Sequence, residues 1–152
     1  MTRRARAVAV TVQNATAGAG VPTPAEVRKW ARAALTADVR GELTVRIVSE
    51  RESAELNARY RGKAGPTNVL SFPASPEHRG RQIGDLVVCA PVVAREAREQ
   101  GKPIASHWAH MIVHGTLHLL GFDHEHAADA KRMEGRERAL LARIGIADPY
   151  GD

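Results

Sequence analysis

The sequence predicts a mixed α/β or α+β fold built around a small sheet, and three observations support this class. Apolar and polar residues alternate along residues 8–12, which is the period of a half-buried strand. Thr23, Pro24 and Glu26 then place a hydroxyl, a proline and a carboxylate where a helix begins. Further segments of both kinds follow in the order strand, helix, strand, strand and then helices, which indicates helices packed on a sheet.

The middle of the chain predicts two more strands and a short helix. The stretch ELTVRIV, residues 42–48, alternates again and predicts the second strand. Ser49 and Glu52 repeat the capping-box spacing, so we expect a short helix through Tyr60. A loop rich in glycine and polar residues leads to VLSF, residues 69–72, which predicts a third strand before a proline.

The second half of the chain predicts one more strand and three helices. IGDLVVCA, residues 83–90, is the fourth expected strand, and Pro91 should open a helix that Gly101 ends. The apolar run at residues 104–120 predicts a long helix, and an amphipathic pattern predicts a last one over about residues 127–144.

Length and composition limit the class of protein. At 152 residues the chain is long enough to bury a core, and we expect one domain over residues 1–152. The lone Cys89 excludes an internal disulfide framework and is interpreted as a small buried hydrophobe. No continuous apolar run suits a signal peptide or a membrane span, so we expect a cytoplasmic protein. A net charge of +5 is compatible with a polyanionic partner but does not establish one.

The stretch HGTLHLLGFDH carries three histidines that predict a metal site. His114 and His118 lie four residues apart and share one helix face. Gly121 should end the helix and let the chain reverse, so that His124 supplies the third ligand. Three neutral imidazoles with a fourth position open to water are typical of a catalytic zinc site. The same donors also suit nickel or copper.

The other histidines are expected to play lesser roles. His110 and His118 are two turns apart, about 12 Å along a helix, so one ion cannot easily bind both. His107 and His110 are therefore interpreted as residues that cap the helix, pack in the core or support the ligands. His78 and His126 are interpreted as surface residues, with His126 a weak alternative for the third ligand.

The acidic residues near the motif are open to more than one interpretation. Asp123 either orients an imidazole or is a solvated turn residue. Glu134 and Glu137 lie in a helix of alternating charges, and we expect both at the surface.

The histidine spacing resembles HExxHxxGxxH of the metzincin peptidases, in which the glutamate is the general base. Here Gly115 stands in that place. General-base help is typically worth about 10²–10⁴-fold in rate, so peptide hydrolysis is disfavoured. Phosphodiesters fit better, because a metal and an arginine can together stabilise charge on phosphate oxygens. Arg61 is the candidate arginine, with a plain surface role as the alternative.

Three segments together resemble the bacterial YbeY family of metal-dependent endoribonucleases that mature ribosomal RNA. They are LNARYRGKAGPTNVLSFP, IGDLVVCA and HWAHMIVHGTLHLLGFDH, followed by a closing ADPY. The resemblance covers about residues 43–150. It implies an α+β fold with a small mixed four-stranded sheet, helices packed over it and a zinc cleft at the long histidine-bearing helix.

Site residues follow from the resemblance position by position. His114, His118 and His124 match the family's zinc ligands, and Arg61 matches its functional arginine, so Arg61 and His114 are the expected catalytic residues. We expect Arg59, Arg61, Lys63 and Asp85 to contact substrate. Ala64 and Phe122 depart from the family's usual aspartate and tyrosine, and neither is an expected ligand.

The resulting hypothesis is a zinc-dependent endoribonuclease, specific for single strands and holding one ion, that acts on ribosomal RNA. The resemblance implies processing at the 3′ end of 16S rRNA and ribosome quality control. Expected partners are single-stranded RNA and small-subunit ribosomal proteins, without DNA or membrane. The alternatives are a non-catalytic ribosome assembly factor stabilised by its metal, or a metal-dependent hydrolase of another substrate. The cleavage site, general base and oligomeric state stay open.

Overall fold

The computed structural model describes residues 8–16, 18, 20–78, 80–122 and 126–151. In chain order its elements are β1 (Val8–Asn14), α1 (Pro24–Ala34), β2 (Gly41–Val48), α2 (Glu50–Arg61), β3 (Val69–Pro73), the short 3₁₀ helix η2 (Pro76–His78), β4 (Gln82–Cys89), α3 (Ala90–Glu99), α4 (Ile104–Leu119) and α5 (Ala127–Arg143). The four strands form one sheet in the order β1-β2-β4-β3. The α+β class with a mixed four-stranded sheet is therefore confirmed, and the predicted elements are present with ends shifted by a residue or so.

The sheet is mixed because one strand, β3, runs against the other three. β1, β2 and β4 run parallel, whereas β3 pairs antiparallel with β4. β3 therefore lies at an edge, with one side bonded to β4 and the other open to the helices and loops around it. An edge strand presents backbone N–H and C=O groups on the side that has no neighbouring strand.

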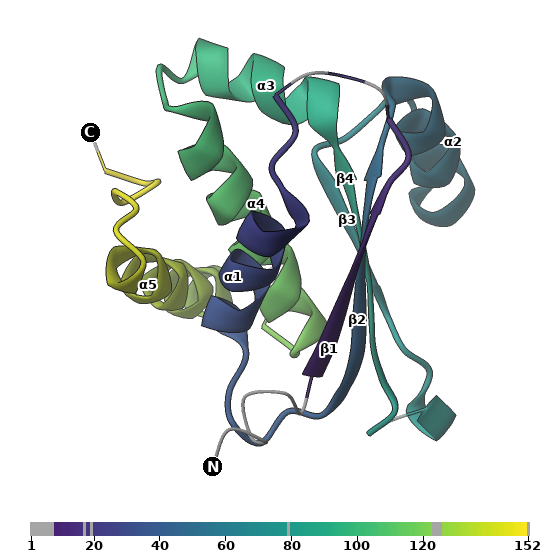
Figure 1. Ribbon diagram of the computed structural model, residues 1–152, viewed down its shortest axis with the longest axis vertical. Coiled ribbons are helices and arrows are strands. Elements are labelled where there is room, and N and C mark those ends of the chain that lie inside the picture. Colours follow the sequence, from purple (N-terminus) through teal and green to yellow (C-terminus); the bar gives the residue numbers. More distant parts are fainter. Residues whose placement is uncertain (1–7, 17, 19, 79, 123–125, 152) are drawn as a thin grey trace.

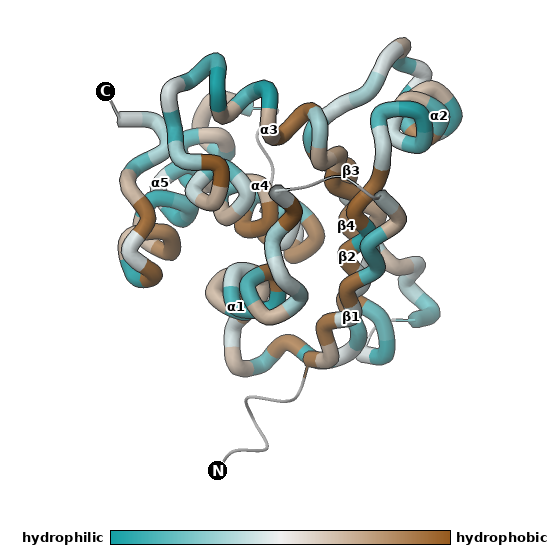
Figure 2. The backbone as a smooth tube through the Cα atoms, turned by 45° about the horizontal axis from the view of Figure 1, so that its top comes forward, coloured by the Kyte–Doolittle hydropathy of each residue, from teal (hydrophilic) through white to brown (hydrophobic). Residues whose placement is uncertain are grey.

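The helices cover the two faces of the sheet unequally. α1, α4 and α5 gather on one face, and α2 lies on the other (Figure 1). The main core lies between the sheet and the helices α1, α4 and α5, and it includes Trp108 and Ile112 of α4. A smaller cluster under α2 contains Cys89, which is 1% exposed, so its predicted burial is confirmed. Figure 2 shows hydrophobic residues along the central strands and hydrophilic ones over much of α2.

The helix starts predicted from capping residues are only partly as expected. At α1, Thr23 and Glu26 form the complete reciprocal capping box. At α2, the Ser49 side chain accepts from the Glu52 backbone N–H at 3.3 Å, but the Glu52 carboxylate turns to Arg46 with contacts of 2.6 and 3.0 Å. A two-bond pairing with a guanidinium is stronger than one bond to a neutral backbone N–H, which explains the difference.

The long helix α4 packs closely on the sheet at Gly115. A Cβ built at this position would lie 2.8 Å from a Leu86 methyl and 3.2 Å from a Val69 methyl. The Ser71 hydroxyl also donates to the Gly115 carbonyl at 3.2 Å. α4 ends as predicted, because Gly121 follows with a φ of +101°. No helix in the described residues is long and apolar enough to cross a membrane.

Candidate metal and substrate site

A cleft of ≈ 390 Å³ opens at the β3 edge of the sheet. It lies where the end of α2, the chain leading into β3 and the histidine-bearing part of α4 meet. Its lining residues are Tyr60, Arg61, Thr67, Asn68, Val69, Leu70, Ser71, Phe72, His114 and His118. Three of the predicted site residues, Arg61, His114 and His118, thus share one cleft. Asp123 and His124, the expected third ligand, lie outside the described residues.

His114 and His118 face the cleft because they lie one turn apart on the same side of α4. Both side chains are half-buried. Gly115 lies between them in sequence but against the sheet, where a side chain would meet Leu86 and Val69. A glutamate at position 115 would therefore point into the core and not toward the cleft. The site has no room for a base at the position the peptidases use.

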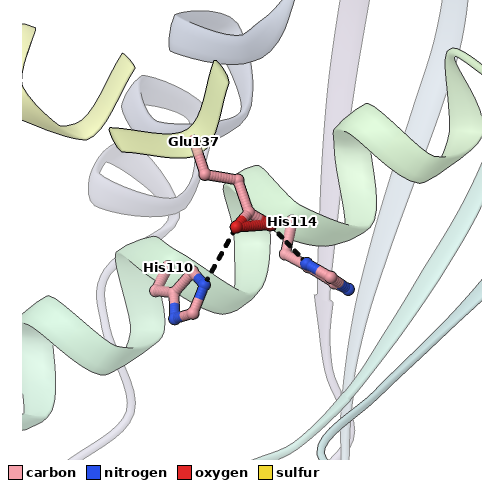
Figure 3. Close-up of side chains that lie close together, drawn as sticks. All are labelled: His110, His114 and Glu137. Carbon is pink, nitrogen blue, oxygen red and sulfur yellow. Dashed lines mark hydrogen bonds and ion pairs between the residues drawn. The ribbon is translucent and has the colours of Figure 1, made fainter. Parts of the chain in front are cut away.

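A buried carboxylate lies behind His114. Glu137 of α5 is 0% exposed, and one of its oxygens bonds His114 Nδ1. Its other oxygen bonds the Tyr150 hydroxyl and lies 3.4 Å from His110 Nε2. Figure 3 shows both imidazoles turned toward this carboxylate. The prediction that Glu137 lies at the surface is wrong. Helical spacing could have predicted its burial. Glu137 follows Met133 by four residues and precedes Leu140 and Leu141 by three and four, and all of these residues are buried.

The charge of this cluster follows from its contacts. Burial raises the pKa of Glu137, but the bonds from His110, His114 and Tyr150 outweigh burial and lower the pKa to about 2. Burial and the neighbouring Glu137 raise the pKa of Tyr150, so its hydroxyl keeps its proton and donates. An ionised carboxylate only accepts, so His114 carries a proton on Nδ1 and donates it to Glu137.

The same cluster is close enough to hold a metal ion. One ligand atom from each of His110, His114 and Glu137 lies within 4.8 Å of the others. Imidazole and carboxylate donors suit zinc and other transition metals. Two donor sets therefore share His114. One is this buried set, and the other is the predicted cleft set, of which the structure describes His114 and His118.

The loop between α2 and β3 is held to α2 by side-chain hydrogen bonds. The Ser53 hydroxyl donates to the Thr67 carbonyl and accepts from the Thr67 N–H, both at 3.0 Å. Asn57 donates its side-chain N–H to the Gly65 carbonyl at 2.8 Å. These buried polar side chains hold the loop, so the part of the cleft wall formed by Thr67 has a defined place.

A second polar network connects the loop to α3 and α4. Glu96 of α3 accepts from the Asn68 side chain at 3.1 and 3.3 Å and bonds His107 Nε2 at 2.9 Å. His107 is 3% exposed, which confirms the expectation that it packs or supports. Burial lowers the pKa of His107, although Glu96 acts in the opposite direction. Neither this network nor the Glu137 cluster was predicted.

The remaining predicted substrate contacts lie around the cleft but do not line it. Arg59 is exposed, with its guanidinium 5.6 Å from the centre of the Tyr60 ring. Lys63 is exposed in the loop after α2. Among the described residues, neither cation takes part in the lining of the histidine cleft.

Asp85 lines a different cavity from the histidines. It pairs in register with Phe72, and the following residue, Leu86, faces α4 at Gly115. Because neighbouring strand residues point to opposite faces, Asp85 lies on the other face of the sheet. There it lines a second cavity of ≈ 500 Å³, which shares Tyr60 and Phe72 with the cleft. Asp85 therefore does not line the cleft of the histidines, and its expected contact with substrate stays a prediction.

Comparisons with known proteins agree on one family. The family model described as "Endoribonuclease YbeY" matches residues 12–145. A Halorhodospira halophila protein of that name is 59% identical over 140 residues, which is 88% of this chain and 91% of the relative. A Stenotrophomonas maltophilia protein of the same name is 50% identical over 99% of this chain and 98% of its own length. The solution structure of a Thermotoga maritima protein shares the fold, with a TM-score of 0.55 and 24% identity over 95% of this chain and 100% of that one.

Proposed function

The chain belongs to the YbeY family, and on that premise we propose that it is a metal-dependent endoribonuclease of ribosomal RNA maturation. The observation that carries the proposal is the shared cleft of Arg61, His114 and His118. This cleft combines a cation for phosphate with imidazoles for a metal. The relatives' names supply the reaction class.

The metal of the proposal is one zinc ion held by His114, His118 and His124. The described donors fit it, because two half-buried imidazoles share one helix face and one cleft. The bond to Glu137 also holds the proton of His114 on Nδ1, which leaves Nε2 as its ligand nitrogen. A metal bound there would supply a Lewis acid for a phosphoryl oxygen and a means of activating water.

Arg61 acts on the phosphate in this proposal. Arg61 lines the same cleft as the histidines, and a guanidinium can bind a phosphate through two N–H groups at once. Charge builds up on the phosphoryl oxygens during cleavage, and a fixed cation beside them lowers the energy of that state. Arg61 is therefore both a substrate-binding and a catalytic residue.

The substrate proposed is single-stranded RNA. Tyr60 lies on the rim of the cleft, is 58% exposed and packs edge-on against Phe72 with ring centres 5.2 Å apart. An exposed ring beside cations suits an unstacked base, which proteins bind by aromatic stacking. Arg59 and Lys63 extend the positive charge along the chain that leads to the cleft. Asp85 is a proposed contact for RNA that reaches the second cavity, which shares Tyr60 and Phe72 with the cleft.

The setting of this activity completes the proposal. We place it in the cytoplasm, where precursors of small-subunit ribosomal RNA are found, with residues 1–152 acting as one domain. Ribosomal proteins of the small subunit are the expected protein neighbours. Peptide hydrolysis is disfavoured by Gly115, whose place against the sheet leaves no space for a base.

The test is cleavage of a small-subunit ribosomal RNA precursor by zinc-loaded protein. His118→Ala and Arg61→Ala, purified identically, run beside the wild type to exclude contaminating ribonucleases. Loss of cleavage in both variants is expected, with Arg61→Lys intermediate because lysine keeps the charge but not the two-bond geometry. Arg51→Ala, an exposed cation at the far end of α2, is the matched control and should cleave normally. Equal cleavage by all proteins, or by none, would contradict the proposal.

A further inference from the structure

Glu137 is neither a proposed metal ligand nor a proposed catalytic residue, yet it is fully buried and makes contacts with three side chains. We infer that Glu137 is a positioning residue that orients His114 toward the metal of the cleft. The inference rests on the proposed function, since it needs a metal bound by His114 and His118. It adds a residue on α5, outside the histidine motif, to the machinery of the site.

The ring of His114 connects the buried cluster to the cleft. Its Nδ1 bonds Glu137 on the inner side, and the ring itself lines the cleft on the outer side. In Figure 3 the second ring nitrogen points away from Glu137. The carboxylate therefore fixes the rotation of the ring and the position of its proton. A histidine that donates one N–H to a carboxylate becomes a more basic and better-oriented ligand through its other nitrogen.

Accessibility favours this role over direct ligation by Glu137. The Glu137 side chain is 0% exposed and that of His110 is 9% exposed, whereas that of His114 is 25% exposed. An ion held among His110, His114 and Glu137 would be shielded from a polymer such as RNA. The oxygens of Glu137 already accept from His114 and Tyr150, so an ion bound to either oxygen would compete with one of these bonds.

The carboxyl-terminal segment holds Glu137 in turn. The Tyr150 hydroxyl donates to Glu137 and lies 3.2 Å from His110 Nε2. Arg138 places its guanidinium 5.2 Å from the centre of the Tyr150 ring and bonds Asp148 at 3.1 Å. These contacts hold Tyr150 beside Glu137, and the order of support runs from Tyr150 to Glu137 to His114. Loss of the Tyr150 hydroxyl should therefore leave the Glu137 carboxylate less firmly positioned without creating a cavity in the hydrophobic core.

The test measures metal affinity and coordination, not only activity. Zinc affinity is obtained by competition with a chromophoric chelator, and the cobalt(II)-substituted protein gives a visible absorption spectrum. Glu137→Gln and Tyr150→Phe are compared with the wild type, with His118→Ala and with His110→Ala. Glu134→Gln is the matched control, because Glu134 lies on the same helix with a side chain that is 38% exposed. Thermal melts of the metal-free proteins check that each variant is folded.

The expected result is a zinc affinity lowered about 10–100-fold in Glu137→Gln, as is typical when a partner of a histidine ligand is lost. Tyr150→Phe should show a smaller loss in the same direction, and Glu134→Gln none. The cobalt spectrum should change shape in Glu137→Gln. If Glu137→Gln is too unstable to measure, the loss in Tyr150→Phe carries the test.

Three results would overturn the inference, and they differ in what they mean for the proposed function. Wild-type affinity and spectrum in both Glu137→Gln and Tyr150→Phe, with no binding by His118→Ala, would refute positioning and keep the cleft metal. Undiminished binding by His118→Ala, with complete loss in Glu137→Gln and His110→Ala, would make Glu137 a ligand and refute both. A wild type that binds no metal would also refute both.

Discussion

Gly115 shows how much of the site depends on the size of a single residue. It carries no side chain, and this permits α4 to approach β3 and β4 so closely that His114 and His118 reach the edge of the sheet. The same closeness removes the position from which a metzincin-like base would act. One glycine therefore contributes to the packing of the helix and to the choice of chemistry.

Substitution of Gly115 should cost stability even though alanine is the better helix former. A Cβ there would meet buried methyl groups of Leu86 and Val69, and such overpacking typically costs about 1–3 kcal/mol. The gain in helix propensity offsets about 1 kcal/mol, so we expect Gly115→Ala to lower the free energy of unfolding by about 1 kcal/mol. Urea denaturation measures the change.

Gly135 is the matched control for that experiment. It lies in the exposed part of α5, and a Cβ there would meet nothing within 4 Å. Gly135→Ala should therefore raise the free energy of unfolding by up to about 1 kcal/mol. A stabilised Gly115→Ala would show that the helix can move off the sheet at little cost.

At the scale of elements, two carboxylates, the half-buried Glu96 and the buried Glu137, join α3, α4 and α5 around the cleft. Glu96 links α3 to the loop before β3 and to α4, and Glu137 links α5 to α4. Each of these carboxylates has its partners on other elements of the chain. The elements around the cleft are thus held by directional bonds as well as by apolar packing.

The burial of His107 predicts how stability depends on pH. Burial lowers its pKa below the ordinary value, with Glu96 facing it from α3 and raising the pKa, and His110 and Lys102 lowering it further. The folded state therefore binds this proton less readily than the unfolded state. Stability should fall as the pH drops below about 6.5, the ordinary histidine pKa.

A variant isolates this contribution. His107→Gln keeps a donor toward Glu96 but cannot titrate, so its stability should vary less than that of the wild type between about pH 7 and pH 5. His78→Gln, at an exposed histidine, should follow the wild type. The midpoint of urea denaturation is measured across this pH range. If the midpoint varies with pH in the same way for the wild type and His107→Gln, His107 does not contribute to the pH dependence.

The elements themselves could be predicted from the sequence because their signals are local. The alternation of apolar and polar residues predicted the first two strands, capping residues predicted the start of α1, and Gly121 predicted the end of α4. The partners of the histidines could not be predicted in the same way. Glu137 was judged by the charges next to it in sequence, whereas its burial depends on α5 packing against α4. The position of Asp85 in a strand was predicted, but its face of the sheet follows only from the packing of α4 against the neighbouring Leu86.

At the scale of the molecule, the core does not depend on the metal site. The main cluster under α1, α4 and α5 contains Trp108, Ile112 and Leu141, and the histidines of the cleft lie at its margin. Removal of metal by a chelator should therefore lower the melting temperature by a few degrees and leave the fold intact. Structural zinc, in contrast, contributes folding free energy directly, and its loss would unfold the domain. Circular dichroism melts distinguish the two results.

The distribution of charge predicts the salt dependence of RNA binding. The chain has a net charge of +5, and the exposed Arg59, Arg61 and Lys63 lie together at the end of α2. Three phosphate contacts with a single strand should give a slope of about −2 for log affinity against log salt concentration. Arg61→Ala should reduce the magnitude of that slope by about 0.7. Fluorescence anisotropy with a labelled oligonucleotide measures it, and a flat dependence would exclude phosphate contacts as the basis of binding.

The position of the metal ion tests the central claim most directly. Crystals of the zinc-loaded protein, with anomalous scattering recorded at the zinc edge, would locate the ion without any assay of activity. The ion is expected in the cleft, bound by Nε2 of His114 and by His118, with Glu137 bonded to Nδ1 of His114 and Arg61 in the same cleft. An ion buried among His110, His114 and Glu137, or no bound ion at all, would contradict a metal-dependent reaction in the cleft.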